Sequence, residues 1–126
     1  MEIKVTVIIP IYNMELYLAE CLETVTNQTL REIEILCIND GSTDNSLQIL
    51  ENYRKSDTRF VIIDQKNHGV AASRNQGIQM AQGKYVMFMD SDDKYPDEYV
   101  IEKLYEAAEA YHVKIAGGEF SDFDPD

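Results

Sequence analysis

Residues 4–25 read KVTVIIPIYNMELYLAECLETV and contain the pattern that decides the fold. Residues 5–9 are a short run of apolar, mostly β-branched side chains that Pro10 ends, which predicts a buried strand. Over residues 15–25 the apolar side chains recur at helical spacing, as Leu16, Ala19, Leu22 and Val25. A helix is therefore predicted directly after the strand, and the two make one βα unit.

The same alternation continues along the chain. Further strands are predicted at residues 33–38, 60–63, 85–89 and 113–116. Further helices are predicted at residues 44–54, 70–82 and 97–111, the last opening at Pro96 or Asp97. Asp44 is expected to cap the first of these and Gly83 to stop the second. Such alternation is typical of right-handed βαβ units. We expect a single α/β domain over residues 1–126, with a mostly parallel sheet flanked by helices.

The composition narrows the class of protein. Of the 126 residues, 44% are hydrophobic and 27% are charged, which is an ordinary balance for one soluble, folded domain. The formal net charge is -12. Binding to nucleic acid or to anionic lipid needs clustered Lys and Arg, so neither is expected. Most of the carboxylates are interpreted as surface groups that keep the protein soluble.

Cys21 and Cys37 are expected to be reduced, mostly buried thiols, because each falls in an apolar pattern. The first four residues lead straight into a strand, so no signal peptide is predicted. No stretch approaches the length of about 18 apolar residues that a membrane span needs. The expected location is the cytoplasm, with the inner face of the cell membrane left open as an alternative.

Polar residues follow each of the first four predicted strands. In an open parallel sheet, ligands bind beyond the carboxyl ends of the strands, so these residues are candidates for a binding site. Turn formation explains part of the pattern, because Asp, Asn, Gly and Ser are common in turns. At three of the four strand ends, an acidic residue also stands at the edge of the apolar run. This favours a binding role for the four segments taken together. The four segments are residues 10–13, 39–44, 64–69 and 90–93.

Three carboxylates, Asp90, Asp92 and Asp93, stand close together after the fourth strand. Their mutual repulsion is costly unless solvent or a cation relieves it. Oxygen ligands on a loop suit Mg²⁺ or Mn²⁺, which proteins often share with substrate phosphates. The alternative is an acidic flank to the helix that begins near Pro96, where negative charge is favoured. The spacing alone leaves both interpretations open.

Three other residues at the predicted strand ends suit a nucleotide. Asp40 can accept hydrogen bonds from a base N–H or a ribose hydroxyl, although it also suits a turn before Gly41. Arg74 can contact phosphate or base, or pair with one of the many surface acids. Tyr12 lies where it can cover a base. The sequence contains neither G-x-G-x-x-G nor a G-K-[ST] phosphate loop, which argues against a dinucleotide or P-loop enzyme.

Together these segments resemble the motifs of the family 2 inverting glycosyltransferases with the GT-A fold. The resemblance extends from Val5 to about Lys103. In chain order the matching segments are VIIPIYN at 7–13, NDGSTDNS at 39–46, NHGVAASRNQG at 67–77 and MDSDD at 89–93, the last matching the D-x-D metal motif. The resemblance implies a Rossmann-like fold, the nucleotide-binding half of a GT-A domain.

The resemblance also implies a role for each motif residue. Asp40 would pair with the base, usually uracil, and Arg74 would lie near the nucleotide. Asp92 would ligate Mn²⁺ or Mg²⁺ directly, Asp90 would approach both ribose and metal, and Asp93 would assist. The implied nucleotide-binding set is Pro10, Tyr12, Asn13, Asp40, Arg74, Asp90 and Ser91, and the implied metal set is Asp92 and Asp90.

The implied activity is that of a hexosyltransferase. It would move a sugar with inversion from a nucleoside-diphosphate sugar, expected to be a UDP-sugar, to a hydroxyl of a glycan or lipid-linked acceptor, as in polysaccharide biosynthesis. Such a reaction needs a general base, which this family draws from a region well past the D-x-D motif. We therefore expect a domain truncated before its acceptor-binding half, with no catalytic base assigned.

Two other functions remain open on the sequence. One is a non-catalytic module that binds a nucleotide sugar but lacks the acceptor site. The other is a nucleotidyltransferase on a related fold, which the absence of a Gly-rich, Arg-containing loop after the first strand disfavours. An unpaired sheet edge would also favour self-association into a homo-oligomer.

Overall fold

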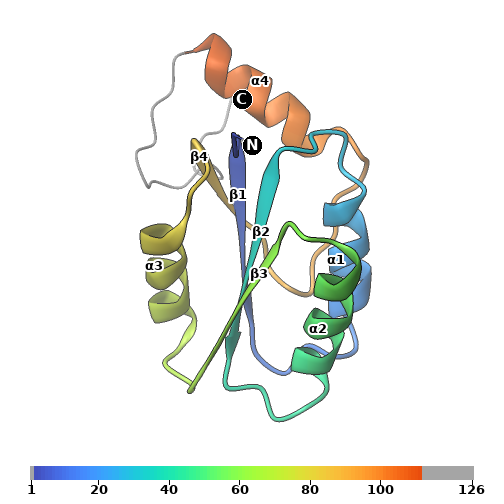
Figure 1. The fold of residues 1–126 in the computed structure, drawn as a ribbon, viewed down its shortest axis with the longest axis vertical. Coiled ribbons are helices and arrows are strands. Elements are labelled where there is room, and N and C mark those ends of the chain that lie inside the picture. The colour runs from blue at the N-terminus through green and yellow to red at the C-terminus, as the bar shows by residue number, and fades with distance from the viewer. Residues whose placement is uncertain (1, 112–126) are drawn as a thin grey trace.

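The computed structural model describes residues 2–111. Four parallel strands form one sheet in the order β3-β2-β1-β4 (Figure 1). Four helices connect and follow them, so the predicted α/β class with a parallel sheet is confirmed. The elements are β1 (Val5–Ile11), α1 (Leu18–Thr26), β2 (Ile33–Asp40), α2 (Ser46–Ser56), β3 (Phe60–Gln65), α3 (Val70–Met80), β4 (Tyr85–Phe88) and α4 (Val100–Ala110).

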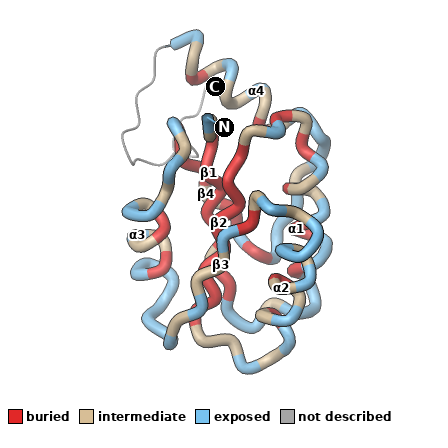
Figure 2. Tube along the Cα trace, viewed as in Figure 1, coloured by how far each residue is buried: buried red, intermediate tan, exposed pale blue. Residues whose placement is uncertain are grey.

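Alternating side chains of β1 build two separate cores. Val5, Val7 and Ile9 face a large core that also takes the buried side chains of α1, α2 and α4. Ile8 faces the opposite side of the sheet, where the smaller core includes Ile78 of α3. Burial therefore runs along the centre of the sheet, while the outer faces of the helices are exposed (Figure 2). Because helices cover both faces of the sheet, we expect a ligand to bind at the ends of the strands.

β1 continues through Pro10 to Ile11, so the prediction that Pro10 ends this strand was wrong. The carbonyl of Ile8 accepts a hydrogen bond from Met89 N–H on the β4 side. Pro10 lies two residues further on and faces the same side. Because β4 pairs with β1 only as far as Ile8, the N–H that proline lacks has no partner strand to bind.

The start of α1 also differs from the prediction. Residues 15–17 form a turn, and the helix begins at Leu18. The backbone N–H groups of Met14 and Glu15 donate to side chains of the loop after β2, which holds this segment outside the helix. α4 likewise begins at Val100 rather than near Pro96, and the carbonyl of Asp97 accepts a hydrogen bond from Gln28 Nε2.

Two predicted helix signals have other roles. Gly83 does not stop α3, which ends at Met80. A Cβ at Gly83 would lie 2.5 Å from the backbone nitrogen of Thr6, so glycine is needed there for close approach to β1. Asn45, not Asp44, is the N-cap of α2, although Oδ1 of Asp44 accepts the N–H of Ser46 at 2.9 Å.

The state of the cysteines agrees with the sequence prediction. Cys21 and Cys37 are both free and buried, as expected. Within residues 2–111, every helix is too short or too polar to cross a membrane. The strand predicted at residues 113–116 lies outside the described residues.

Candidate functional site

A cavity of about 370 Å³ opens at the carboxyl ends of β1, β2 and β4. This volume lies within the range of small-molecule sites. Six of the residues predicted from the sequence line it: Pro10, Tyr12, Asp40, Asp90, Ser91 and Asp92. The parallel sheet thus brings residues from opposite ends of the sequence to one edge. Ile11, from the candidate segment 10–13, completes the lining together with Met14, Val70 and Ser73, for which no binding role was predicted.

Tyr12 and Val70 give the cavity apolar walls. Tyr12 is 48% exposed and Val70 is 55% exposed. Tyr12 follows the last residue of β1, and Val70 is the first residue of α3. Exposed apolar side chains beside a cavity can cover a flat ring and shield it from water.

Asp40, the last residue of β2, is buried and holds the neighbouring loop in place. Its Oδ1 accepts the backbone N–H of His68 at 2.8 Å, and its Oδ2 accepts that of Gly69 at 2.9 Å. Burial pushes the pKa of this carboxyl upward, but hydrogen bonds from His68, Gln65 and Gly69 outweigh burial and hold the pKa below its ordinary value. Asp40 is therefore a fixed negative charge at the cavity wall.

The same carboxylate retains capacity for a ligand. Each carboxylate oxygen can accept two hydrogen bonds, and within residues 2–111 Oδ2 of Asp40 accepts one. Gly41, which follows, has a φ of 76°, and a Cβ there would lie 2.7 Å from the backbone nitrogen of Asn67. Asp40 thus lines the cavity and also precedes the turn at Gly41, while its predicted contact with a nucleotide stays a prediction.

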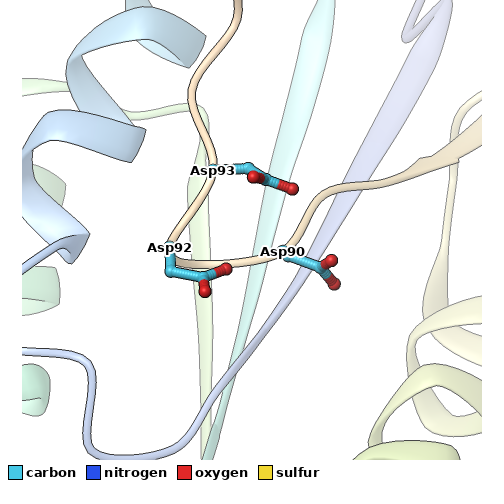
Figure 3. A group of neighbouring side chains, drawn as sticks. All are labelled: Asp90, Asp92 and Asp93. Atoms are coloured by element: carbon cyan, nitrogen blue, oxygen red, sulfur yellow. The ribbon is translucent and has the colours of Figure 1, made fainter.

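The loop after β4 gathers the three predicted acids. Asp90, Asp92 and Asp93 are exposed, and each offers a carboxylate oxygen within 4.8 Å of the others. Figure 3 shows the three side chains on this loop, which a hydrogen bond from Asp93 N–H to the Asp90 carbonyl closes at 3.0 Å. Like charges this close favour a cation, and an all-oxygen donor set suits Mg²⁺ or Mn²⁺. The residues present therefore fit a divalent ion.

Arg74 lies beside this loop but does not line the 370 Å³ cavity. Its Nη2 is 3.5 Å from Oδ1 of Asp90, and its guanidinium lies over the Phe88 ring at 5.7 Å from the centroid. An exposed pair at this distance adds little stability. Arg74 instead lines an adjacent hollow of about 320 Å³ with Asp90 and Asp93.

Asn13 also lies outside the cavity lining. Its φ is 51°, in the left-handed region that Asn tolerates better than most residues. Its Oδ1 accepts the backbone N–H of Thr43 at 2.8 Å, and its own N–H donates to Oγ of Ser42 at 3.0 Å. Asn13 therefore connects the loop after β1 to the loop after β2.

Further hydrogen bonds between these two loops were not predicted from the sequence. Met14 N–H donates to Oγ of Ser46 at 3.0 Å, and Glu15 N–H donates to Oδ2 of Asp44 at 3.1 Å. In return, Asn45 N–H donates to Oε2 of Glu15 at 2.8 Å. The run of Ser, Thr, Asp and Asn at 42–46 signals side chains that bind backbone groups. It does not reveal which backbone groups they bind.

The glycosyl transferase family 2 model matches residues 6–126. The chain belongs to glycosyltransferase family 2. Glycosyltransferase GlyA of Streptococcus pneumoniae serotype 4 is 44% identical over 120 residues, covering 95% of this chain and 17% of GlyA. Glycosyltransferase GlyG of the same organism is 39% identical over 121 residues, covering 95% of this chain and 40% of GlyG.

A solved structural neighbour agrees with the fold. S. aureus TarS 1-349 in complex with UDP-GlcNAc superposes with a TM-score of 0.80 at 32% identity, covering 86% of this chain and 32% of that one. The same protein has also been solved in complex with UDP. This family 2 chain spans less than half the length of these relatives. The GT-A type of fold expected from the sequence is confirmed.

Proposed function

We propose that this chain is the donor-binding part of a metal-assisted family 2 glycosyltransferase that uses a UDP-sugar. One observation carries the proposal: Asp40 and the pair Asp90 and Asp92 line the same cavity. A buried carboxylate suits a ligand with an N–H donor, and exposed carboxylates at the same cavity suit a diphosphate that is held through a divalent ion. A nucleoside diphosphate has both.

The base would bind at Asp40 and Tyr12. The free acceptor capacity of Asp40 Oδ2 suits the single N–H of a uracil ring, and the exposed ring of Tyr12 would cover the base. Pro10 would form the floor beside it. S. aureus TarS, 32% identical to this chain, forms complexes with UDP and UDP-GlcNAc, which supports uracil as the base.

The diphosphate would lie toward the loop after β4. Asp92 would be the direct ligand of Mn²⁺ or Mg²⁺, with Asp90 and Asp93 beside it. Such an ion, when bound, supplies positive charge that makes the diphosphate a better leaving group. Ser91 is 4% exposed at the cavity wall, and Arg74 would move from Asp90 to a phosphate oxygen.

The proposed reaction is transfer of a hexose to an acceptor hydroxyl with inversion. The acceptor oxygen would form a bond to the anomeric carbon as the bond from that carbon to the diphosphate breaks. A general base must take the acceptor's proton, and we assign this role to none of residues 2–111. The acceptor would be a glycan or a lipid-linked glycan, met in the cytoplasm or at the inner face of the membrane.

A non-catalytic module that binds a nucleotide sugar is the second candidate. The chain spans 17% of GlyA and 40% of GlyG, and this partial coverage fits the second candidate no better than the first. The acceptor half is proposed to correspond to the remaining length of those proteins. Both candidates share the same donor site. Transfer of sugar to an acceptor, measured with the chain itself, would separate them.

Calorimetry with UDP tests the shared site. We expect UDP to bind several-fold more tightly with Mn²⁺ than without it, and Asp92→Asn to remove that difference. Glu106→Gln is the matched control, because it removes the same charge from an exposed position on α4. Absence of UDP binding with and without Mn²⁺ would overturn the proposal, and so would an equal metal effect in Asp92→Asn.

A further inference from the structure

The loops after β1 and β2 exchange hydrogen bonds in both directions. From the first loop, backbone N–H groups of Asn13, Met14 and Glu15 donate to side chains of the second. From the second loop, the N–H groups of Thr43 and Asn45 donate to side chains of the first. We call this set the inter-loop network; its members are Asn13, Met14, Glu15, Ser42, Thr43, Asp44, Asn45 and Ser46.

Each loop of the inter-loop network carries or adjoins residues that line the cavity. Tyr12 precedes Asn13 in the chain, and Met14 follows it; both line the cavity. Asp40, the last residue of β2, lies just before the second loop and is separated from Ser42 by Gly41. The sheet pairs β1 with β2 as far as Ile11 and Asn39, and beyond that point the inter-loop network ties the loop that carries Tyr12 to the loop that follows Asp40.

Asn13 is the member best suited to hold the two loops together. It bonds through both its backbone N–H, to Ser42, and its side-chain oxygen, to Thr43. Its positive φ turns the chain out of β1 at the point where these two bonds can form together. The amide oxygen is thus already used within the protein, and the residue is absent from the cavity lining.

We propose that Asn13 is a positioning residue for the nucleotide, acting through Ser42 and Thr43 without touching the ligand. The inference rests on the proposed function, because it concerns the same cavity. Without Asn13, the two loops would sample more arrangements, and nucleotide binding would have to select one of them. We expect the cost of that selection to weaken nucleotide binding and to make the entropy of binding less favourable.

Two substitutions at Asn13 separate positioning from contact. Asn13→Gly keeps the positive φ accessible but removes the side-chain oxygen that accepts Thr43 N–H. Asn13→Asp tolerates the same φ and keeps that oxygen while removing the amide NH₂. Because Asn13 is exposed, moderate salt screens the new charge of the aspartate variant.

UDP binding by calorimetry at about 0.3 M salt is the measurement. We expect Asn13→Gly to bind UDP about fivefold to tenfold more weakly, which corresponds to the free energy of about one hydrogen bond. Asn13→Asp should recover most of that loss. A ligand contact through the amide NH₂ predicts the opposite order, since aspartate would then bind most weakly. Such an order would overturn the proposal.

Ser42→Ala supplies a second arm, with Ser56→Ala as its control. Both remove one hydroxyl hydrogen bond, but Ser56 lies at the end of α2 and bonds the carbonyl of Tyr53. Ser42→Ala should weaken UDP binding, and its effect should be less than additive with that of Asn13→Gly. Full additivity, or an equal effect of Ser56→Ala, would contradict a shared network.

Amide hydrogen exchange without nucleotide tests the network on its own. In Asn13→Gly, the N–H of Thr43 should exchange faster, while amides in the centre of β2 stay unchanged. If wild type binds no UDP, the proposed function fails first. If wild type binds UDP and Asn13→Gly binds it equally well, only the positioning role of Asn13 fails.

Discussion

The hydroxyl of Thr6 donates a 2.8 Å hydrogen bond to Oε1 of Glu34, its partner in the register between β1 and β2. The same carboxylate oxygen accepts the backbone N–H of Gln82 at 3.1 Å, and Oγ1 of Thr6 accepts that of Gly83 at 2.9 Å. Glu34 is only 6% exposed. A buried carboxylate thus holds the turn between α3 and β4 against the two central strands, β1 and β2. The contact lies at the amino-terminal ends of these strands, opposite the cavity.

Glu34→Ala should therefore destabilise the fold by about 2 to 3 kcal/mol, since it leaves buried donors without a partner. Urea unfolding measures the effect. Glu32→Ala is the control, because Glu32 makes an exposed ion pair with Lys4 at 3.2 Å, and its loss should change stability by about 0.5 kcal/mol or less. Equal effects of the two substitutions would mean that the buried hydrogen bonds contribute no more to stability than the ion pair of Glu32.

Gly83→Ala should be destabilising by about 2 to 3 kcal/mol, as expected for overpacking. The added Cβ would meet backbone, the nitrogen of Thr6 at 2.5 Å and the carbonyl carbon of Val5 at 2.7 Å, which cannot turn aside as a side chain can. Thermal unfolding is the measurement. Gln82→Ala, which keeps its backbone hydrogen bond to Glu34, should lower stability far less; a similar loss would refute the steric cause.

Stability should fall as the solution is acidified. Burial raises the pKa of Asp40 and of Asp44, but hydrogen bonds outweigh it in both cases, so each pKa is lower in the folded protein than in the unfolded chain. Their contribution is present above the unfolded pKa of about 3.9 and is lost as pH falls through the lower folded pKa. Urea midpoints between pH 7 and pH 2 measure it, and Asp44→Asn should flatten the profile. An unchanged profile in that variant would contradict the assignment.

Both thiols should resist alkylation in the folded protein. Burial, with smaller effects of the charges of Asp93, Asp92 and Asp90, raises the pKa of Cys21 to about 12, and burial also raises that of Cys37. Neither sulfur is a thiolate at neutral pH, so iodoacetamide should react slowly until urea is added. A cysteine introduced by Ser56→Cys, at an exposed position, should react quickly in the same mass-spectrometric assay. Rapid labelling of Cys21 before unfolding would show that its burial is transient.

The hydrophobic runs were sufficient to predict the four described strands and their parallel direction. Runs such as 33–38 have no alternating polar face, which is typical of strands covered on both sides, and β2 is buried along its length. The ends of elements were harder to predict. β1 continues through Pro10 because its neighbour β4 is shorter, and the length of a neighbour is not contained in the local sequence.

The candidate site could also be predicted only in part. Parallel strands bring their carboxyl ends together, so the sequence alone was enough to expect Asp40 and Asp92 at one edge of the sheet. The hydrogen bonds of Asn13 to Ser42 and Thr43 could not be predicted, because they join loops about thirty residues apart through backbone groups of no distinctive type. Asp44 was interpreted as a helix cap, whereas its Oδ2 accepts from Glu15 across the two loops.

The length of β1 beyond β4 has one further consequence. A strand edge left bare usually invites another chain to add a strand, and a chain that did so here would close the cavity. At Pro10 the bare edge has no N–H to offer, so an incoming strand would find its ladder interrupted where the cavity begins. The proline thus removes a backbone donor at the cavity wall, where an added strand would need one.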